Sequence, residues 1–170
     1  TAAHCVSPAS IGSGQQIDLL PGTQLALPGI TTSSRTFNPA WNINNLQACH
    51  DEGILHTTQT LSPICNRGTL NTGAQVKLVG YGSNTHANGG VGTKRTATVN
   101  IVATNAVLLQ DGTSNRQTCH GDSGGPAFQN GLVVGVTSFG SDRSATNVCF
   151  GGGFHCRVDA DAAFINANTN

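Results

Sequence analysis

The stretch GDSGGP, residues 121–126, is the most informative part of this 170-residue sequence. It places a single hydroxyl, that of Ser123, among glycines that let a substrate approach and let backbone N–H groups turn toward a common point. Such a loop is suited to exposing a nucleophile. Because a neutral serine is a weak nucleophile, it needs a base within hydrogen-bonding reach, and that base needs a carboxylate to orient it.

Two further residues can supply the base and the carboxylate. His4 lies in the segment TAAHC, residues 1–5, where small residues precede it and a cysteine follows. Asp51 opens the segment DEGIL, residues 51–55, and the adjacent Glu52 is a rival carboxylate. The chain therefore carries a histidine, an aspartate and a serine in that order, a set that predicts nucleophilic catalysis.

The composition limits the class of protein. Eight basic and eight acidic residues give a formal net charge of zero, and only 9% of the residues are charged. This balance argues against a nucleic-acid-binding protein. The length suits one domain, and 37% hydrophobic residues are enough for a sizeable core. No apolar run approaches the roughly 18 residues that a membrane helix needs.

The pattern of short segments predicts an all-β fold. Stretches rich in Val, Ile, Thr and Leu alternate with clusters of Gly, Asn, Ser and Pro, as in a barrel or sandwich. The clearest predicted strands span residues 75–79, 97–102, 106–109 and 132–138. Residues 31–45, which include the single tryptophan, Trp41, are expected to form a surface loop. Only the end is expected to be helical, with Asp159 capping residues 160–165.

Six cysteines in so short a chain favour a disulfide framework made in an oxidising compartment. They show neither C-x-x-C spacing nor the paired ligand doublets of a zinc finger. Cysteine and histidine also occur side by side, but neighbouring residues on a strand point to opposite faces, so no metal site is expected. Spacing alone does not decide the pairing, because four cysteines already allow three pairings.

The two motifs together resemble those of one family. The chain is similar to the chymotrypsin-like (trypsin-like) serine endopeptidases, whose catalytic histidine lies in T-A-A-H-C and whose serine lies in G-D-S-G-G-P. VGYG at residues 79–82, TSFG at 137–140 and FI at 164–165 match further family segments, so the resemblance covers nearly the whole chain.

The resemblance implies an architecture. It is that of a single protease domain over residues 1–170, all-β, with two six-stranded antiparallel barrels and a C-terminal helix. About residues 1–65 would be the remainder of a first barrel that is incomplete in this chain, and about 70–170 would form the second barrel and the helix.

The resemblance also assigns catalytic roles, those of the well-known triad of this family. Ser123 attacks the scissile carbonyl, His4 takes and returns the proton, and Asp51 holds the imidazole in the right tautomer. The N–H groups of Gly121 and Ser123 form the oxyanion hole.

A further implication concerns activation. In the family, the carboxylate at the position of Asp122 pairs with the amino terminus that zymogen cleavage creates, which orders the oxyanion hole and the specificity pocket. The family begins with a hydrophobic residue, Val-Gly-Gly and several strands before T-A-A-H-C. We therefore expect a zymogen with an N-terminal part upstream of Thr1, and an inactive, aggregation-prone product if the 170 residues are expressed alone.

Two disulfides follow from the resemblance. Cys119 and Cys149 match the family's bridge beside the primary specificity pocket. Cys49 and Cys156 are additions to the family pattern, on segments that run close together in this fold, and we predict a bridge between them. The cysteine at position 5 is expected to pair upstream, and that at position 65 is left over.

Substrate specificity is open at this stage. In the family, an aspartate six residues before the nucleophile selects Arg or Lys, but here that residue is Gln117, so a trypsin-type preference is not expected. The other substrate-binding positions implied by the resemblance are His120, Ser138, Phe139, Gly140, Gly153 and His155. Two histidines and an amide favour a polar or acidic substrate side chain. If Gln117 and His155 instead bond to each other, the pocket suits a medium or large apolar side chain.

Two functions from different classes remain. The first is a secreted, or otherwise extracytoplasmic, serine endopeptidase that acts on protein or peptide substrates and is open to proteinaceous protease inhibitors. The second is a non-catalytic binding module that kept the protease fold. The complete set of triad residues favours the first. No cofactor, metal, nucleic acid or membrane partner is expected.

Overall fold

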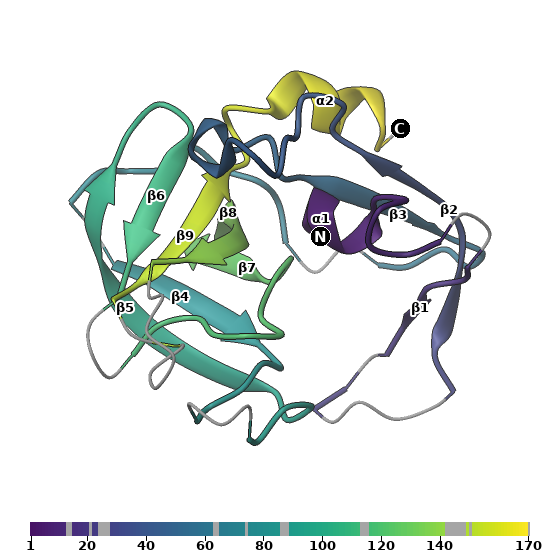
Figure 1. Cartoon of the computed structure of the whole chain (residues 1–170), viewed down its shortest axis with the longest axis horizontal. Helices are drawn as coiled ribbons and strands as arrows, with labels where there is room; N and C mark the ends of the chain where they lie inside the picture. Colours follow the sequence, from purple (N-terminus) through teal and green to yellow (C-terminus); the bar gives the residue numbers. More distant parts are fainter. Residues whose placement is uncertain are drawn as a thin grey trace.

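The computed structural model describes residues 1–12, 15–20, 22–23, 28–62, 65–73, 75–85, 89–112, 116–141, 149 and 151–169. A small sheet and a closed barrel lie side by side, with a short helix near each end of the chain (Figure 1). The elements are α1 (Ala3–Val6), β1 (Asp18–Leu19), β2 (Ile30–Phe37), the 3-10 helix η1 (Leu46–Ala48), β3 (Gly53–Thr57), β4 (Gln75–Gly80), β5 (Arg95–Thr104), β6 (Leu108–Asp111), β7 (Pro126–Gln129), β8 (Leu132–Gly140), β9 (Gly153–Arg157) and α2 (Ala162–Ala167).

The barrel closes in the order β4-β5-β6-β9-β8-β7, with antiparallel neighbours throughout. Its strands follow the two-residue period of a half-buried sheet. In β4, Val76 and Leu78 are buried, whereas Gln75 and Lys77 are exposed. The barrel core consists of Leu70, Val76, Leu78, Val99, Leu109, Ala127 and Val134.

The small sheet has the order β1-β2-β3, and α1 packs on it (Figure 1). Gly53, the first residue of β3, allows this close approach, because a Cβ there would lie 2.5 Å from Val6 Cγ2. Two backbone hydrogen bonds add to the packing: Gly53 N–H donates to the Thr1 carbonyl (2.7 Å), and Ala3 N–H donates to the Asp51 carbonyl (3.0 Å). Together these contacts place α1 beside the segment that contains Asp51.

The predicted all-β class with a C-terminal helix is confirmed. Three of the four segments predicted as strands lie within strands, whereas the predicted strand 106–109 is displaced, because β6 spans Leu108–Asp111. The predicted loop over residues 31–45 is wrong in its first half, because β2 runs through Phe37 and pairs with β3. The Ser- and Thr-rich sequence of β2 is half-buried along most of its length, so it shows no apolar alternation.

The end of the chain differs from the prediction in its cap. Helix α2 has Asp161 as its N-cap residue, whereas Asp159 forms an ion pair with Arg157 (2.7 Å between Oδ2 and Nη2). Ile165 on α2 packs with Ala2, Val136 and Val158, so the helix links the barrel to the N-terminal segment. None of the helices within the described ranges is long and apolar enough to cross a membrane.

Candidate active site

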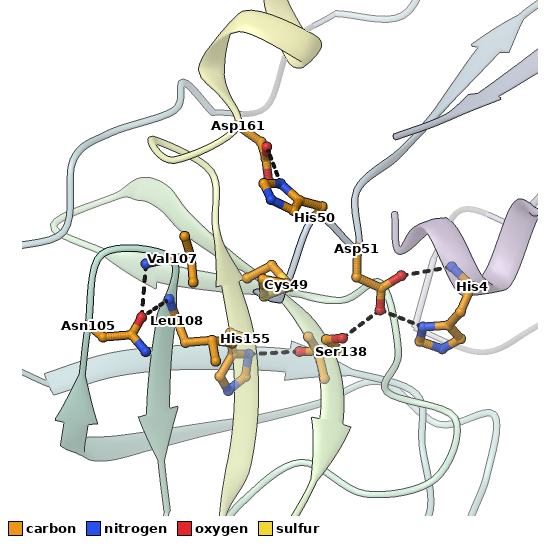
Figure 2. The surroundings of a disulfide bond; sticks show 12 residues. His4, Cys49, His50, Asp51, Asn105, Val107, Leu108, Ser138, His155 and Asp161 are labelled. Carbon is orange, nitrogen blue, oxygen red and sulfur yellow. Dashed lines mark hydrogen bonds and ion pairs between the residues drawn. A yellow bond between two sulfur atoms is a disulfide. The ribbon is translucent and has the colours of Figure 1, made fainter. Parts of the chain in front are cut away.

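Asp51 holds His4 through two hydrogen bonds (Figure 2). The backbone N–H of His4 donates to Asp51 Oδ1 (2.8 Å), and its ring Nδ1 lies 2.6 Å from Asp51 Oδ2. Ser138 Oγ donates to the same Oδ2 atom (2.5 Å). The carboxylate is buried while the His4 side chain is 28% exposed. The imidazole is therefore fixed on its Nδ1 side and accessible to solvent.

The environment of His4 favours its protonated form. The hydrogen bond to Asp51, followed by the neighbouring Cys5 side chain, raises the pKa of His4 above its ordinary value of 6.5. A base held in this way is stronger than a free imidazole. The same carboxylate stabilises the imidazolium that forms when the ring accepts a proton.

Ser123 lies in the loop before β7, which β8 and the N-terminal segment hold in place. Gly124 N–H donates to the Thr137 carbonyl (2.8 Å), and Thr137 N–H donates to the Gly125 carbonyl (2.9 Å). A Cβ at Gly124 would lie 2.8 Å from the backbone nitrogen of Ala2. The loop therefore packs directly against the segment that leads into His4. Among the described residues, no hydrogen bond joins Ser123 to His4 itself.

Asp122 accepts hydrogen bonds from backbone N–H groups on both of its carboxylate oxygens. Its Oδ1 accepts from Gly82 N–H (2.8 Å), and its Oδ2 accepts from Cys119 N–H (2.8 Å). A Cβ at Gly82 would lie 2.6 Å from the Asp122 Cγ atom. Gly121, the first oxyanion-hole residue expected from the sequence, has a φ of 90°, a conformation that favours glycine.

Several of the predicted pocket residues lie around the start of β9. Gln117 Oε1 accepts a hydrogen bond from Gly152 N–H (2.5 Å), and the rings of Phe139 and Phe154 stack with centroids 4.6 Å apart. A side chain at Gly153 would collide with the Thr118 hydroxyl. Of the other predicted pocket residues, His120 and Gly140 are exposed, and Ser138 contacts Asp51.

His155 is placed differently from the expectation. It bonds to Asp111 and Thr137 through its two ring nitrogens, so the alternative in which Gln117 and His155 satisfy each other is wrong. Its side chain is 0% exposed, so the ring is buried rather than at the surface. Asp111 and Thr137 were not identified from the sequence. Asp111 follows closely on the apolar residues 106–109 of a predicted strand, and an acid at such a place was the available signal.

The disulfides join the cysteines paired in the sequence analysis. Cys49 is bonded to Cys156 (Figure 2), and Cys119 is bonded to Cys149. The first bridge ties the turn before Asp51 to β9, and the second ties the loop before Ser123 to the segment before β9. Cys5 and Cys65 are free.

Glu52, the acidic residue next to Asp51, is buried. Glu52 is 2% exposed, and neither of its carboxyl oxygens has a hydrogen-bond partner among the described residues. Burial, followed by the nearby Asp161 carboxyl, raises the pKa of Glu52 to about 9. Asp161 in turn bonds to His50 (2.7 Å between Oδ1 and Nδ1; Figure 2). Glu52 is therefore a neutral buried acid at neutral pH.

Comparisons with known proteins match this chain to one family. The family model described as Trypsin matches residues 1–165. Brachyurin from Leptuca pugilator is 48% identical over 40 residues, which are 24% of this chain and 18% of the relative. Trypsin CFT-1 from Choristoneura fumiferana is 43% identical over 53 residues, 31% of this chain and 20% of the relative. Trypsin, alkaline B from Manduca sexta is 41% identical over 54 residues, which are 32% of this chain and 20% of the relative. The chain thus spans about a fifth of the length of the curated relatives it matches.

A solved structure agrees in fold. Neuropsin, a serine protease expressed in the limbic system of mouse brain, superposes with a TM-score of 0.78 and 22% sequence identity. The match covers 100% of this chain and 83% of neuropsin. This confirms the predicted chymotrypsin-like fold.

Proposed function

Because the chain belongs to the trypsin family, we propose that it is a serine endopeptidase that hydrolyses peptide bonds through His4, Asp51 and Ser123. The observation that carries the proposal is the double hydrogen bond from His4 to the buried Asp51 carboxylate. The packing of the Ser123 loop against the segment before His4 supports it.

The proposed reaction has two steps. Ser123 Oγ bonds to the substrate carbonyl carbon while His4 Nε2 takes the hydroxyl proton, and the peptide C–N bond breaks as that proton passes to the leaving amine. Water then attacks the acyl-enzyme with His4 again as the base, which releases the acid and restores Ser123. The N–H groups of Gly121 and Ser123 would stabilise the oxyanion of each tetrahedral intermediate.

Activation by cleavage is part of the proposal. A cavity of about 330 Å³ opens beside Asp122 and is lined in part by Gly80, Gly82, Thr96 and Cys119. A new amino terminus entering it would bring an ammonium group to a carboxylate that, within the described part of the chain, accepts two backbone N–H groups. Such an ion pair would pull Asp122 away from Gly82 and reset the neighbouring oxyanion hole.

Secretion and a specificity other than that of trypsin complete the proposal. The two disulfides suit an oxidising compartment. Gln117 offers no carboxylate to a cationic substrate side chain, so preference for Arg or Lys is not expected. Peptides and proteins are the proposed substrates, and proteinaceous inhibitors the proposed further partners.

Covalent labelling tests the proposed activity. The full-length, processed protein is incubated with an organophosphonate and mapped by peptide mass spectrometry. We expect one adduct, on Ser123, and none in Ser123→Ala or His4→Ala. Ser34→Ala, which removes an exposed hydroxyl on β2, is the matched control and should label like the wild type. An unlabelled wild-type protein would favour the non-catalytic binding module.

A further inference from the structure

A further histidine–aspartate pair lies inside the barrel, and the proposed mechanism does not use it. His155 on β9 and Asp111 at the end of β6 are each 0% exposed, and His155 Nε2 hydrogen-bonds to Asp111 Oδ2. The other ring nitrogen, Nδ1, lies 3.1 Å from the hydroxyl oxygen of Thr137 on β8. Three buried polar side chains thus form one chain of hydrogen bonds.

The burial of this pair constrains its charge. A lone carboxylate with no exposed surface is strongly unfavourable unless a positive charge balances it. Within the described ranges, no lysine or arginine forms an ion pair with Asp111, and its other hydrogen bond comes from Gly153 N–H at 3.3 Å. The Asp111–His155 pair is therefore net neutral.

Neutrality decides which ring nitrogen carries hydrogen. In an ion pair, the imidazolium has a hydrogen on both nitrogens. In the uncharged pair, the acid O–H of Asp111 donates to Nε2, so the imidazole carries its hydrogen on Nδ1. Both states place a hydrogen on Nδ1, which donates to Thr137 Oγ1. The Thr137 hydroxyl is then an acceptor toward His155, and its own hydrogen is free to be donated elsewhere.

We propose that Asp111 and His155 are positioning residues that present the Thr137 hydroxyl as a hydrogen-bond donor to the substrate side chain preceding the scissile bond, P1. Thr137 is bonded through its backbone to Gly124 and Gly125, directly after the nucleophile. A Cβ at Gly153, a pocket position, would lie 3.4 Å from His155 Nε2. The Asp111–His155 pair therefore borders the predicted P1 pocket.

The donors indicate a class of side chain. The carbonyl oxygen of Gln117 accepts a hydrogen bond from Gly152 N–H, and the amide N–H of Gln117 is the second donor that we assign to the substrate side chain. Two donors and a net-neutral pair suit an uncharged acceptor better than a carboxylate, a cation or an apolar group. The inference, which rests on the proposed protease function, is a preference for glutamine or asparagine at P1.

The position of the hydrogen can be measured without any activity. In full-length protein labelled with 15N-histidine, NMR should show His155 Nδ1 bearing a hydrogen from pH 5 to 8. The signal should be absent from the spectrum of His155→Gln, which assigns it to His155. A bare, pyridine-type Nδ1 would overturn the proposal, even if the protein had no protease activity.

Substrate profiling tests the consequence. Peptides that differ only at P1 (Gln, Asn, Glu, Leu, Arg, Ala) are compared by kcat/KM, with active sites counted by phosphonate labelling. We expect Gln and Asn to be favoured, and Thr137→Val to lower the Gln-to-Ala ratio roughly tenfold, with recovery in Thr137→Ser. Thr98→Val, on an exposed position of β5, is the matched control. A wild-type preference for Leu, Glu or Arg, or an unchanged ratio in Thr137→Val, contradicts the proposal, whereas failure to label Ser123 contradicts the protease function itself.

Discussion

Three histidine–aspartate pairs occur among the described residues, and two of them, His4–Asp51 and His155–Asp111, differ mainly in burial. In the first, His4 is 28% exposed and Asp51 is buried, with the Ser138 hydroxyl on the carboxylate. In the second, His155 and Asp111 are both 0% exposed, with the Thr137 hydroxyl on the imidazole. Because only the first ring reaches solvent, only the first can exchange a proton with a substrate. Between these two pairs, burial rather than residue identity separates the proposed base from the proposed positioning pair.

The largest expected effect concerns the carboxylate of the first pair. Asp51→Asn should lower kcat by about 10⁴-fold, the size known for this change in serine proteases, because the amide favours the wrong tautomer of His4. Steady-state kinetics with a P1 alanine peptide measures it. Asp18→Asn, an exposed acid on β1, is the control. A loss of less than tenfold in Asp51→Asn would mean that His4 does not depend on Asp51.

The next effect, on stability, concerns the Cys49–Cys156 disulfide, which joins the segment before Asp51 to the strand that carries His155. The Cys49–Cys156 disulfide closes a loop with a sequence separation of 107 residues, and removing such a bridge costs about 2–5 kcal/mol. The double variant Cys49→Ala, Cys156→Ala should therefore lose that much unfolding free energy in urea. The variant Cys65→Ala, which removes a free thiol, is the control. Equal losses in both would show that the bridge adds no stability.

How far the sequence predicts these features depends on how local each signal is. GDSGGP and TAAHC are continuous motifs, so the candidate nucleophile and base could be named before the fold was known. Thr137 and Asp111 lie on different strands and meet at His155 only when the barrel closes, so no spacing identifies them. Strand β2 was missed because its Ser and Thr residues lack an apolar period. Long-range contacts therefore limit prediction more than residue chemistry does.

Thr137 and Ser138 are neighbouring hydroxyl residues on β8 that bond to different histidine–aspartate pairs. Ser138→Ala should lower kcat by about 10- to 100-fold for every P1 residue, because it removes a hydrogen bond to the charged Asp51 carboxylate. Thr137→Val should instead change the order of P1 preference. Both variants are measured on the same set of peptides. If Ser138→Ala altered only the P1 preference, the division of roles between the two pairs would be wrong.

The smallest effect is on the pH dependence of stability. Since the folded-state pKa of Glu52, about 9, exceeds its ordinary 4.5, its stabilising protonated form is fully present below pH 4.5 and is lost as the pH rises toward 9. Charges on Asp51 and Asp161 oppose its ionisation. The Tm of the wild type should fall by several degrees more than that of Glu52→Gln between pH 5 and 9. A parallel fall in both proteins would show that Glu52 is not the titrating group.

The most direct test of the central claim is the pH profile of kcat/KM for the processed protein. Because Asp51 raises the pKa of His4, activity should rise through a pKa above 6.5, and the residual activity of Asp51→Asn should rise through a lower one. We expect this downward shift of the apparent pKa in Asp51→Asn. A wild-type profile that rises at the ordinary value of 6.5 and does not move in Asp51→Asn would contradict it.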